Sequence, residues 1–569
     1  MRKRNGKVIL SLLAVVGLLG SMGLMAAPNT ARTPVDLPVL DPQPVAVLSI
    51  ASVDELKADV AFVGNLVGNP QLATAMEVVL NLATQGRGLQ GLDTARPLGV
   101  VAVTDGERIG GYVCLPVSDF QKLLETAKAV GAKVDEAGEG VYRVATRRRP
   151  IFVKEQSGWA VVSEERPVLD VVPADPGKVL ADVGREYDLA ARLHAANVPE
   201  KHRRELIDKI KRDAERDMRR RPGESEEQHA LRKQVTEELL STVVSLVEEV
   251  DEVTLGVSLD HDAQQAAIEL SITGAEGTEV AKAAARLKET TSGFAGFMLP
   301  DATLSGHWSG QMPSQKSELL VTVIEAVRKQ AMRDIEKEDK SAEEIRVARE
   351  LAGEVFDLVA DTARSGRVDG GMALVLKTRA ATLAAGTYIA DGADLDRITK
   401  QVARIAEAQN PRVKELVKLD ADRCEGVRFH TVSIPVPPDA EDREKVVSLV
   451  GESLEVVIGI GEKSAYVAAG RDALGTLKRA ITTSAKEASQ KVPPVRLSLA
   501  VDLLAEFIAE YGQPKDRPGA AKLAELLGES PGKDRVNLVA QPILRGVKYR
   551  LEAESDILTA LGKLAAKRK

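Results

Sequence analysis

Residues that could carry out chemistry occur at a few places in the sequence, and the first is similar to a phosphate-binding loop. Residues 459–464 (GIGEKS) have the glycine spacing of such a loop but lack its Gly-Lys-Ser ending. They also lie between two predicted strands, whereas a phosphate loop opens a helix. We therefore predict a hairpin turn at this position and no nucleotide site.

Residues 528–532 (GESPG) have the Gly-x-Ser-x-Gly spacing of a nucleophile elbow. That motif needs a strand before the serine and a helix after it, so that the hydroxyl is exposed on a strained turn. Here a predicted helix comes first and a predicted strand follows. The order favours a helix that ends at Gly528, followed by a turn, and no catalytic serine.

Asp260, His261 and Asp262 combine ligand types that metal ions prefer. Three adjacent residues in a turn point in different directions, however, and aspartates are common in turns without a metal. The remaining histidines show neither an HExxH motif nor paired spacing: His194, His202, His229, His307 and His430. The sequence therefore predicts no metal ligands, no catalytic residues, no cofactor-binding residues and no cofactor.

Two arginine triplets, 147–149 and 219–221, could bind phosphate or an anionic surface. The second follows a helical segment in which basic and acidic residues alternate, which is typical of a solvated face with ion pairs. Aromatic residues are not interleaved with the basic ones. We therefore predict that the protein does not bind nucleic acid.

The N-terminus predicts export. Residues 2–7 are basic, residues 8–25 are uncharged and mostly apolar, and Ala26 and Ala27 follow, which is the order of a signal peptide. The apolar run is also near the length that spans a bilayer, so residues 1–27 are predicted to be either a cleaved signal or an uncleaved anchor in the inner membrane. In the second case residues 8–25 would be the only membrane contact. Residues 28–44 contain five prolines and predict a semi-rigid spacer.

Composition describes the rest of the chain as a globular protein of several domains. The net charge of −7 is small for 569 residues, and two cysteines are too few for a disulfide framework. Aromatic residues make up 3% of the chain. This scarcity argues against a surface that stacks sugars or bases.

A unit of strand, helical segment, two strands and helix recurs four times. The units are predicted at 45–185, 186–290, 302–490 and 495–569, so that two halves, 45–290 and 302–569, each contain two units. Capping boxes at Ser225–Gln228 and Ser341–Glu344 open similar helices in the second and third units. The first and third units share a strand that begins Gly-Val, at Gly140 and Gly426.

Two further patterns belong to these units. Trp159 and Tyr466 occupy matching places in the first and third units. Apolar residues at helical spacing predict one buried face for each long helix that a capping box opens: Val235, Leu239, Val243, Leu246 and Val250, and Ile345, Ala348, Ala352, Val355 and Val359. Hairpins joined by short turns, such as that at Asp105-Gly106, favour antiparallel pairing. We predict an α+β fold with a largely antiparallel sheet covered by helices.

The leader, the proline-rich spacer, the repeated units and a strand of the type Asp-x-Val-Thr-Leu-Gly-Val, here residues 251–257, resemble a broad group of large exported bacterial proteins of unknown function. The resemblance implies no activity and no catalytic residues.

Because no catalytic cluster is visible, we expect a non-enzymatic protein of the periplasm or cell envelope that binds or assembles with an envelope protein or a lipid. Two alternatives are a periplasmic carrier or chaperone for an apolar ligand, and an exported hydrolase whose residues form no linear motif.

Overall fold

The computed structural model describes residues 43–145, 149–337, 341–528 and 533–567. It has an α+β fold in which the strands pair antiparallel, as the hairpin-rich sequence predicted. The leader and almost all of the spacer lie outside the described residues. Within the part of the chain that is described, no helix is both long and apolar enough to cross a bilayer.

The chain forms two compact units that are not continuous in sequence. Unit 1 contains residues 1–210, 244–275 and 552–569, and unit 2 contains residues 211–243 and 276–551. The division passes through helices α6 (Glu200–Asp217) and α7 (Glu226–Glu249) and through strand β20 (Gly546–Glu554). The predicted halves, 45–290 and 302–569, were defined by the order of elements along the chain, which differs from a division into compact units. These halves stay a prediction.

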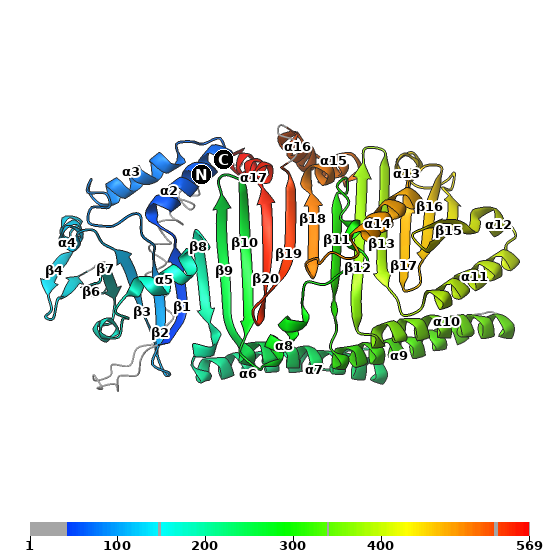
Figure 1. Ribbon diagram of the computed structural model, residues 1–569, viewed down its shortest axis with the longest axis horizontal. Helices are drawn as coiled ribbons and strands as arrows, with labels where there is room; N and C mark the ends of the chain where they lie inside the picture. The colour runs from blue at the N-terminus through cyan, green and yellow to red at the C-terminus, as the bar shows by residue number, and fades with distance from the viewer. Residues whose placement is uncertain (1–42, 146–148, 338–340, 529–532, 568–569) are drawn as a thin grey trace. The chain divides into compact units, whose positions relative to one another are not determined.

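In unit 1 each strand pairs antiparallel with its neighbours in the order β4-β5-β6-β7-β3-β2-β1-β8-β9-β10. Figure 1 shows these strands from blue to green. Their bounds are β1 Gln43–Ile50, β2 Leu98–Thr104, β3 Ile109–Pro116, β4 Lys133–Glu136, β5 Val141–Ala145, β6 Ile151–Gln156, β7 Trp159–Ser163, β8 Leu189–His194, β9 Val250–Asp260 and β10 Gln265–Gly274.

Unit 2 repeats this strand order, β14-β15-β16-β17-β13-β12-β11-β18-β19, with each strand numbered ten higher than its counterpart. The bounds are β11 Leu304–Gln311, β12 Arg367–Lys377, β13 Ala380–Tyr388, β14 Val417–Cys424, β15 Val427–Pro435, β16 Ser453–Ile460, β17 Ser464–Gly470, β18 Val495–Ala500 and β19 Arg535–Ile543. Trp159 in β7 and Tyr466 in β17 therefore lie on corresponding strands, and both are buried.

The helices follow the same recurrence, since two helices come after each of β1, β8, β11 and β18, and one helix follows each hairpin. The paired helices are α2 Val53–Leu66 and α3 Leu72–Ala83, α6 and α7, α9 Ser314–Glu336 and α10 Ala342–Arg364, and α15 Val501–Tyr511 and α16 Arg517–Leu527. The single helices are α4 Phe120–Ala129, α8 Glu279–Arg286, α11 Gly392–Gln409 and α17 Ser555–Lys567. Further helices are α5 Pro176–Gly184, α12 Val413–Leu416, α13 Arg443–Val450 and α14 Ala473–Glu487.

Local signals in the sequence form as predicted. The Ser225–Gln228 and Ser341–Glu344 capping boxes make both reciprocal hydrogen bonds, at the starts of α7 and α10. Glu-Gly turns, at 139–140 and 425–426, join β4 to β5 and β14 to β15 with positive φ at both residues. Two consecutive positive φ angles are typical of type I′ hairpin turns, and glycine adopts them without strain.

One face of each sheet is packed into a core. In unit 1 that core lies under α5 and contains Val47, Val101 and Trp159, each at most 2% exposed. In unit 2 it lies under α14 and contains Phe297, Phe429 and Leu477. Cys114 and Cys424 are both free.

The predicted buried faces of α7 and α10 are largely wrong, although Val250 is buried as predicted. Leu239 in α7 is 62% exposed, and Val243 and Leu246 are 40% exposed. In α10 the buried side chains include Leu358 and Ala360, whereas Val355 and Val359 are exposed. The physical reason is that α9 and α10 pack mainly on each other, around Ile324, Phe356 and Ala360, so only a narrow stripe of α10 is covered.

Candidate functional site: an uncovered apolar face on each sheet

The second face of the unit 1 sheet is entirely aliphatic over five neighbouring strands. Register places its side chains in three rows across β2, β1, β8, β9 and β10. The rows are Leu98-Ile50-Leu189-Val257-Ile268, Val100-Leu48-Ala191-Leu255-Leu270 and Ala102-Ala46-Leu193-Val253-Ile272. We call these three rows the apolar floor of unit 1.

Within the described part of the chain, the apolar floor is not packed against a second layer. Of its residues only Ile50 is buried, and Leu255 and Ile268 are each 48% exposed. The residues that alternate with them on the same strands, such as Val47 and Ala190, are almost fully buried on the other face. An antiparallel sheet with one solvated face normally carries polar residues on that face. On β1 and β2 both faces are apolar, whereas on β8, β9 and β10 the other face carries polar side chains such as Arg192, Thr254 and Glu269, so the apolar side of these three strands is the exposed one.

Unit 2 has the same feature on the corresponding strands. Its apolar floor crosses β17, β13, β12, β11, β18 and β19. Two of its rows contain no polar side chain, Ala469-Leu383-Leu374-Leu304-Leu499-Val536 and Val467-Ala385-Met372-Gly306-Leu497-Leu538. A third row, Ala465-Thr387-Gly370-Trp308-Val495-Ala540, has a single threonine.

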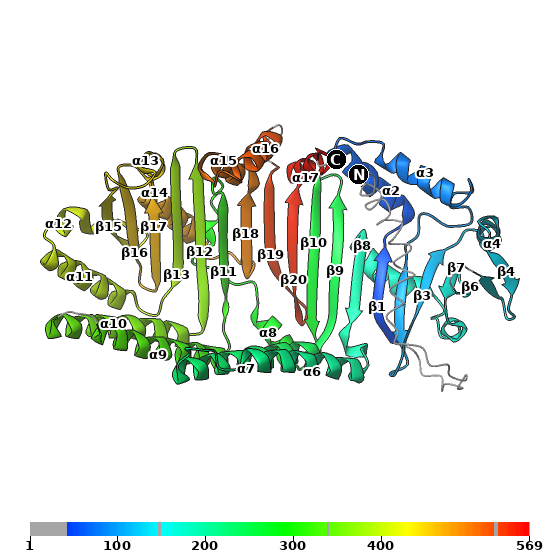
Figure 2. The same ribbon diagram turned by 180° about the vertical axis from the view of Figure 1, so that it is seen from behind.

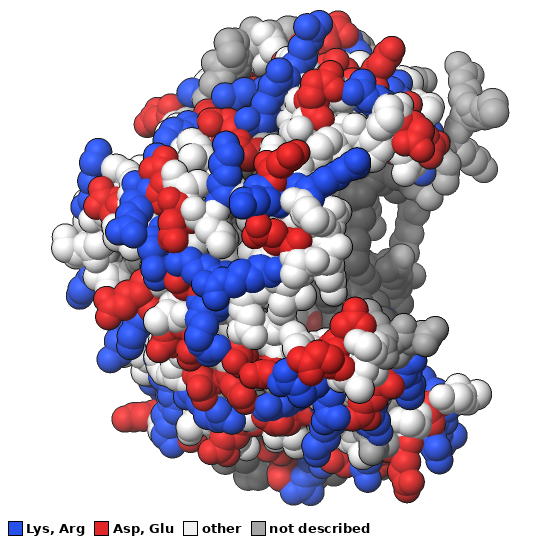
Figure 3. All heavy atoms as spheres, turned by 90° about the vertical axis from the view of Figure 1, so that its right-hand side faces the viewer, with Lys and Arg blue, Asp and Glu red and all other residues white. Residues whose placement is uncertain are grey.

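Among the described residues, helices border these floors at the ends of the strands, and side chains of the central strands such as Leu255 and Leu383 are exposed. In unit 2, α9 and α10 lie along one end of the strands and α15 and α16 along the other (Figures 1 and 2). Exposed aliphatic side chains on the bordering helices include Val327 in α9, Val355 and Val359 in α10, and Val402 in α11. Figure 3 faces the β14–β16 end of unit 2 and shows a hollow on one side, bordered in part at its near edge by residues without charge.

At the outer end of each sheet a helix does cover the same face. In unit 1, α4 packs there through Phe120 and Leu124 onto Val144, Val153 and Ala160. In unit 2 the corresponding helix is α11, which reaches β15 through the side chain of Asp396. Each floor is therefore closed at its outer end and open over its central strands.

The covering helix of unit 2 holds a buried Asp–His pair. The amide of Asp420 donates to Nδ1 of His430 at 3.0 Å, so the ring proton lies on Nε2, which donates to Asp396 at 3.1 Å. The second oxygen of Asp396 forms ion pairs with Lys400 at 3.1 Å and with Arg428 at 3.2 Å. Lys400 also pairs with Asp420 at 3.0 Å. Both ring nitrogens are used and two cations balance two carboxylates, so this cluster is suited to stabilising the fold rather than to holding a metal.

Unit 1 holds a second Asp–His pair with different surroundings. Nε2 of His261 lies 2.9 Å from Oδ1 of Asp59, and Phe62 stacks on the imidazole with ring centroids 4.7 Å apart. Glu55 is close enough that its carboxylate, that of Asp59 and a ring nitrogen of His261 lie within 4.8 Å of one another. Burial, and then the negative charge of Asp188, raise the pKa of Asp59 to about 6.

The turn containing Asp260, His261 and Asp262 was not expected to have a second ligand group, but α2 supplies one. Oδ1 of Asp260 accepts hydrogen bonds from the backbone amides of Asp262 and Ala263, so this aspartate stabilises the turn as predicted. His261 leaves the turn and meets Asp59, which is 202 residues away in sequence. No local spacing in the sequence could have revealed that contact.

Of the two other motif-like segments, residues 459–464 form the hairpin turn that the sequence predicted, and the turn predicted after Gly528 lies outside the described residues. Residues 459–464 join β16 to β17 in a hairpin, closed by a hydrogen bond from the amide of Gly461 to the carbonyl of Ser464. Helix α16 ends at Leu527 with Gly528 as its C-cap, and Ser530 lies outside the described residues. Among the other histidines, His194 and His202 contact glutamates, and His307 is buried on β11.

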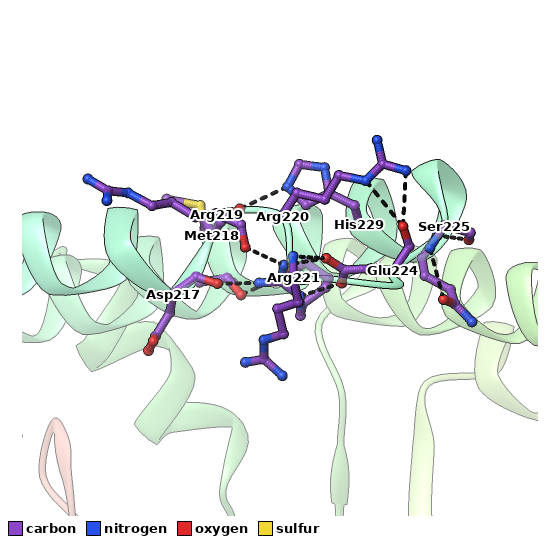
Figure 4. Close-up of polar contacts among 11 residues, drawn as sticks. Asp217, Met218, Arg219, Arg220, Arg221, Glu224, Ser225 and His229 are labelled. Carbon is purple, nitrogen blue, oxygen red and sulfur yellow. Dashed lines mark hydrogen bonds and ion pairs between the residues drawn. The ribbon is translucent and has the colours of Figure 1, made fainter.

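The second arginine triplet takes part in the turn between α6 and α7 (Figure 4). Arg220 donates to the carbonyl of Glu224, and the amide of Arg221 donates to its carboxylate. Arg232 forms a bidentate pair with the same carboxylate, at 2.7 and 2.8 Å, and holds the pKa of Glu224 down at about 2. Of the first triplet only Arg149 is described, and it lies 4.0 Å from Glu164.

The sequence reasoning missed the apolar floors, although a signal was present. Strands such as residues 45–50 (VAVLSI) and 98–103 (LGVVAV) are apolar at nearly every position, whereas a half-solvated strand alternates with polar residues. Comparison with family models, with curated proteins and with solved structures found no match.

Proposed function

We propose that the protein is a non-catalytic carrier of a lipid or similar long-chain amphiphile, and that aliphatic chains lie on the apolar floor of each unit. The observation that carries the proposal is the continuity of the floor in unit 1, where three rows across five strands contain only Ala, Val, Leu and Ile. Contiguous exposed apolar surface of this kind marks a binding site in soluble proteins.

The chemistry of the floors favours an alkyl chain over a protein surface. Protein interfaces are enriched in Tyr, Trp and Arg and form about one hydrogen bond per 100–200 Å². The unit 1 floor offers neither aromatic nor polar side chains, and its backbone groups are already paired within the sheet. A surface without directional groups suits a ligand that has none along most of its length.

Burial of an alkyl chain supplies enough free energy for such binding. Each methylene removed from water contributes about 0.8 kcal/mol, so a chain of about sixteen carbons gains on the order of 12 kcal/mol. Immobilisation offsets roughly 4 kcal/mol or more of that gain. The remainder, at most about 8 kcal/mol, corresponds to a dissociation constant of about 1 μM or weaker, which suits a carrier that must also release its ligand.

The site of action we propose is the cell envelope. The basic, apolar and small-residue segments of residues 1–27 support export, and the proline-rich residues 28–44 support a spacer between the body and a membrane or cleavage site. Lipids exposed to water between membranes need an apolar surface to travel on, which connects the proposed location with the proposed ligand.

The alternatives from the sequence fit these features less well. An assembly partner would use the same exposed floors, and it remains an outcome of the test below. A hydrolase needs a nucleophile beside a base, yet within the described residues neither His261 nor His430 hydrogen-bonds to a hydroxyl or thiol.

The proposal is tested by native purification of the full chain from its own envelope, followed by mass spectrometry of the extracted lipids and titration with a fluorescent fatty acid. We expect co-purified lipid, and in Leu255→Lys at least a tenfold weaker probe affinity at the unit 1 floor with about half the amount of bound probe, because the ammonium group enters that floor and the unit 2 floor is unchanged. Val130→Lys is the matched control, since Val130 is 44% exposed and is the C-cap of α4, and it belongs to none of the three rows of the floor. A chain that binds no probe, or equal binding in both variants, would contradict the proposal; recovery of a stoichiometric protein in place of lipid would favour assembly.

A further inference from the structure

Two carboxylates on one helix face meet a histidine from a distant turn in unit 1. Glu55 and Asp59 are four residues apart in α2, so their side chains lie on the same side of the helix. His261 comes from the turn between β9 and β10 and is fixed by stacking on Phe62. Oxygen and imidazole nitrogen donors of this kind are the ligands that borderline divalent cations prefer.

The distances suit a single ion. Oδ1 of Asp59 and Nε2 of His261 are 2.9 Å apart, and the three donor atoms lie within 4.8 Å of one another. Two ligands each about 2.1 Å from an ion and at a right angle lie about 3.0 Å apart, so only a small movement of Glu55 is needed to close a three-ligand set. Glu55 is exposed, which leaves the remaining positions to water.

In the part of the chain that the structure describes, a protonated His261 is the only counterion that the carboxylates of this cluster contact. Asp59 is 94% buried, and the nearby negative charge of Asp188 helps to raise the pKa of Asp59. The carboxylate of Asp188 accepts a hydrogen bond from the amide of Leu259 at 2.6 Å. Within the described residues neither Glu55 nor Asp59 forms an ion pair with a lysine or arginine. The contrast is the Asp396–His430 cluster, where Lys400 and Arg428 neutralise the acids and both ring nitrogens are engaged.

We propose that Glu55, Asp59 and His261 form a divalent-cation site that takes Zn²⁺ or Mn²⁺ and ties α2 to the β9–β10 hairpin. One imidazole with two carboxylates favours these ions over Mg²⁺, which prefers oxygen ligands and keeps most of its water. A bound ion supplies the positive charge that the cluster lacks, and it links two elements that are far apart in sequence.

The competing explanation is a hydrogen-bonded Asp–His pair with no ligand. That explanation accounts for Asp59 and His261, but it gives Glu55 no role. The role of Glu55 therefore separates the two explanations, and its substitution is also the least disruptive one because the side chain is exposed.

The experiment is calorimetric titration of the chelator-treated full chain with ZnCl₂ and with MnCl₂, with MgCl₂ as the reference ion, and with thermal unfolding as a second readout. We expect one Zn²⁺ or Mn²⁺ per chain and a rise in the unfolding temperature. Glu55→Gln should weaken binding at least tenfold, and His261→Gln should abolish it. Asp262→Asn is the control. It removes one negative charge, as Glu55→Gln does, but from a residue of the His261 turn that is not a proposed ligand, and this variant should bind the ion like wild type.

Two results would overturn the site. One is the absence of saturable Zn²⁺ and Mn²⁺ binding to a folded wild-type chain. The other is equal affinity in wild type, Glu55→Gln and Asp262→Asn, which would place any bound ion elsewhere. If His261→Gln fails to fold, Glu55→Gln still decides the question. A Co²⁺-loaded sample adds a spectroscopic check, because its visible bands change when the imidazole ligand is lost.

Discussion

Units 1 and 2 share one strand order and one uncovered apolar face, yet each holds an Asp–His pair in opposite surroundings. In unit 2 the pair lies under α11, and Lys400 and Arg428 balance its acids. In unit 1 the pair lies between α2 and the β9–β10 turn, and carboxylates surround it. The same two residue types therefore stabilise a helix on a sheet in one unit and leave an uncompensated charge in the other.

The comparison shows which parts of the architecture are shared and which are specific to one unit. Strand order, Glu-Gly turns and apolar floors occur in both units, so we assign them to the common task of binding aliphatic chains. The charges around the histidine differ between the units: cations neutralise the acids in unit 2 but not in unit 1. We therefore propose separate roles for the two clusters, fold stability in unit 2 and ion binding in unit 1.

The largest expected effect comes from Asp396→Asn. This substitution leaves Lys400 and Arg428 without the carboxylate that they share and should cost about 2–3 kcal/mol, somewhat less than for fully buried pairs because both cations are partly exposed. Asp59→Asn, tested in the presence of chelator, should be neutral or stabilising because it removes an uncompensated charge. Urea unfolding followed by circular dichroism measures both variants. Equal losses of stability in the two variants would remove the contrast between the units.

The second prediction tests whether the two apolar floors are equivalent. Val467, on β17 of unit 2, is 48% exposed, the same as Leu255 in unit 1. We expect Val467→Lys and Leu255→Lys each to reduce the amount of bound fatty-acid probe by about half, with at least a tenfold loss of affinity at the altered floor, about 1.4 kcal/mol. The double variant should bind almost none. If one single variant removes all binding, only that unit carries ligand.

The elements and their order could be predicted from the sequence because their signals are local. Hairpin turns, capping boxes such as Ser341–Glu344 and apolar strands each depend on a few neighbouring residues, and they appear in the structure where predicted. The buried stripe of α10 was predicted at the wrong positions, since the partner helix α9 and not a broad core decides which residues are covered.

The candidate sites could not be predicted, because they depend on contacts between distant segments. Leu255 alternates in β9 with Thr254, Gly256 and Ser258, a pattern that predicts a buried Leu255, yet Leu255 is 48% exposed and Thr254 is buried, because what covers each face depends on distant segments. The contact between Asp59 and His261 joins residues 202 positions apart. The neutralisation of Asp396 by Arg428 likewise follows from the packing of α11 on β15, which the sequence pattern does not specify.

The third prediction tests whether every acidic pair in unit 2 is neutralised, as that around His430 is. The amide of Asp502, at the start of α15, donates to the carboxylate of Asp534 at 3.3 Å, and burial followed by the hydrogen bond to Asp534 raises the pKa of Asp502 to about 6. The folded state then holds a proton that the unfolded state releases, so this group's contribution to stability falls as pH rises from about 4 to about 6. Asp502→Asn should remove that decline and raise the unfolding temperature at pH 7.5 by roughly 3 °C. A pH profile identical to wild type would show that the pair is neutralised after all.

The smallest expected effect compares the two helical hairpins through their capping boxes. Ser341→Ala removes the hydroxyl that caps α10 and should cost about 0.5–1 kcal/mol. Ser225→Ala removes the same cap from α7, but there Arg232 independently binds Glu224 and the carbonyl of Arg219 across the turn. Because that network holds the turn without the serine, the second variant should cost less than half as much as the first in thermal unfolding at pH 7. Adding Arg232→Ala to Ser225→Ala should restore the full cost of the lost cap, and a larger loss for Ser225→Ala alone would mean that the arginine does not hold the turn.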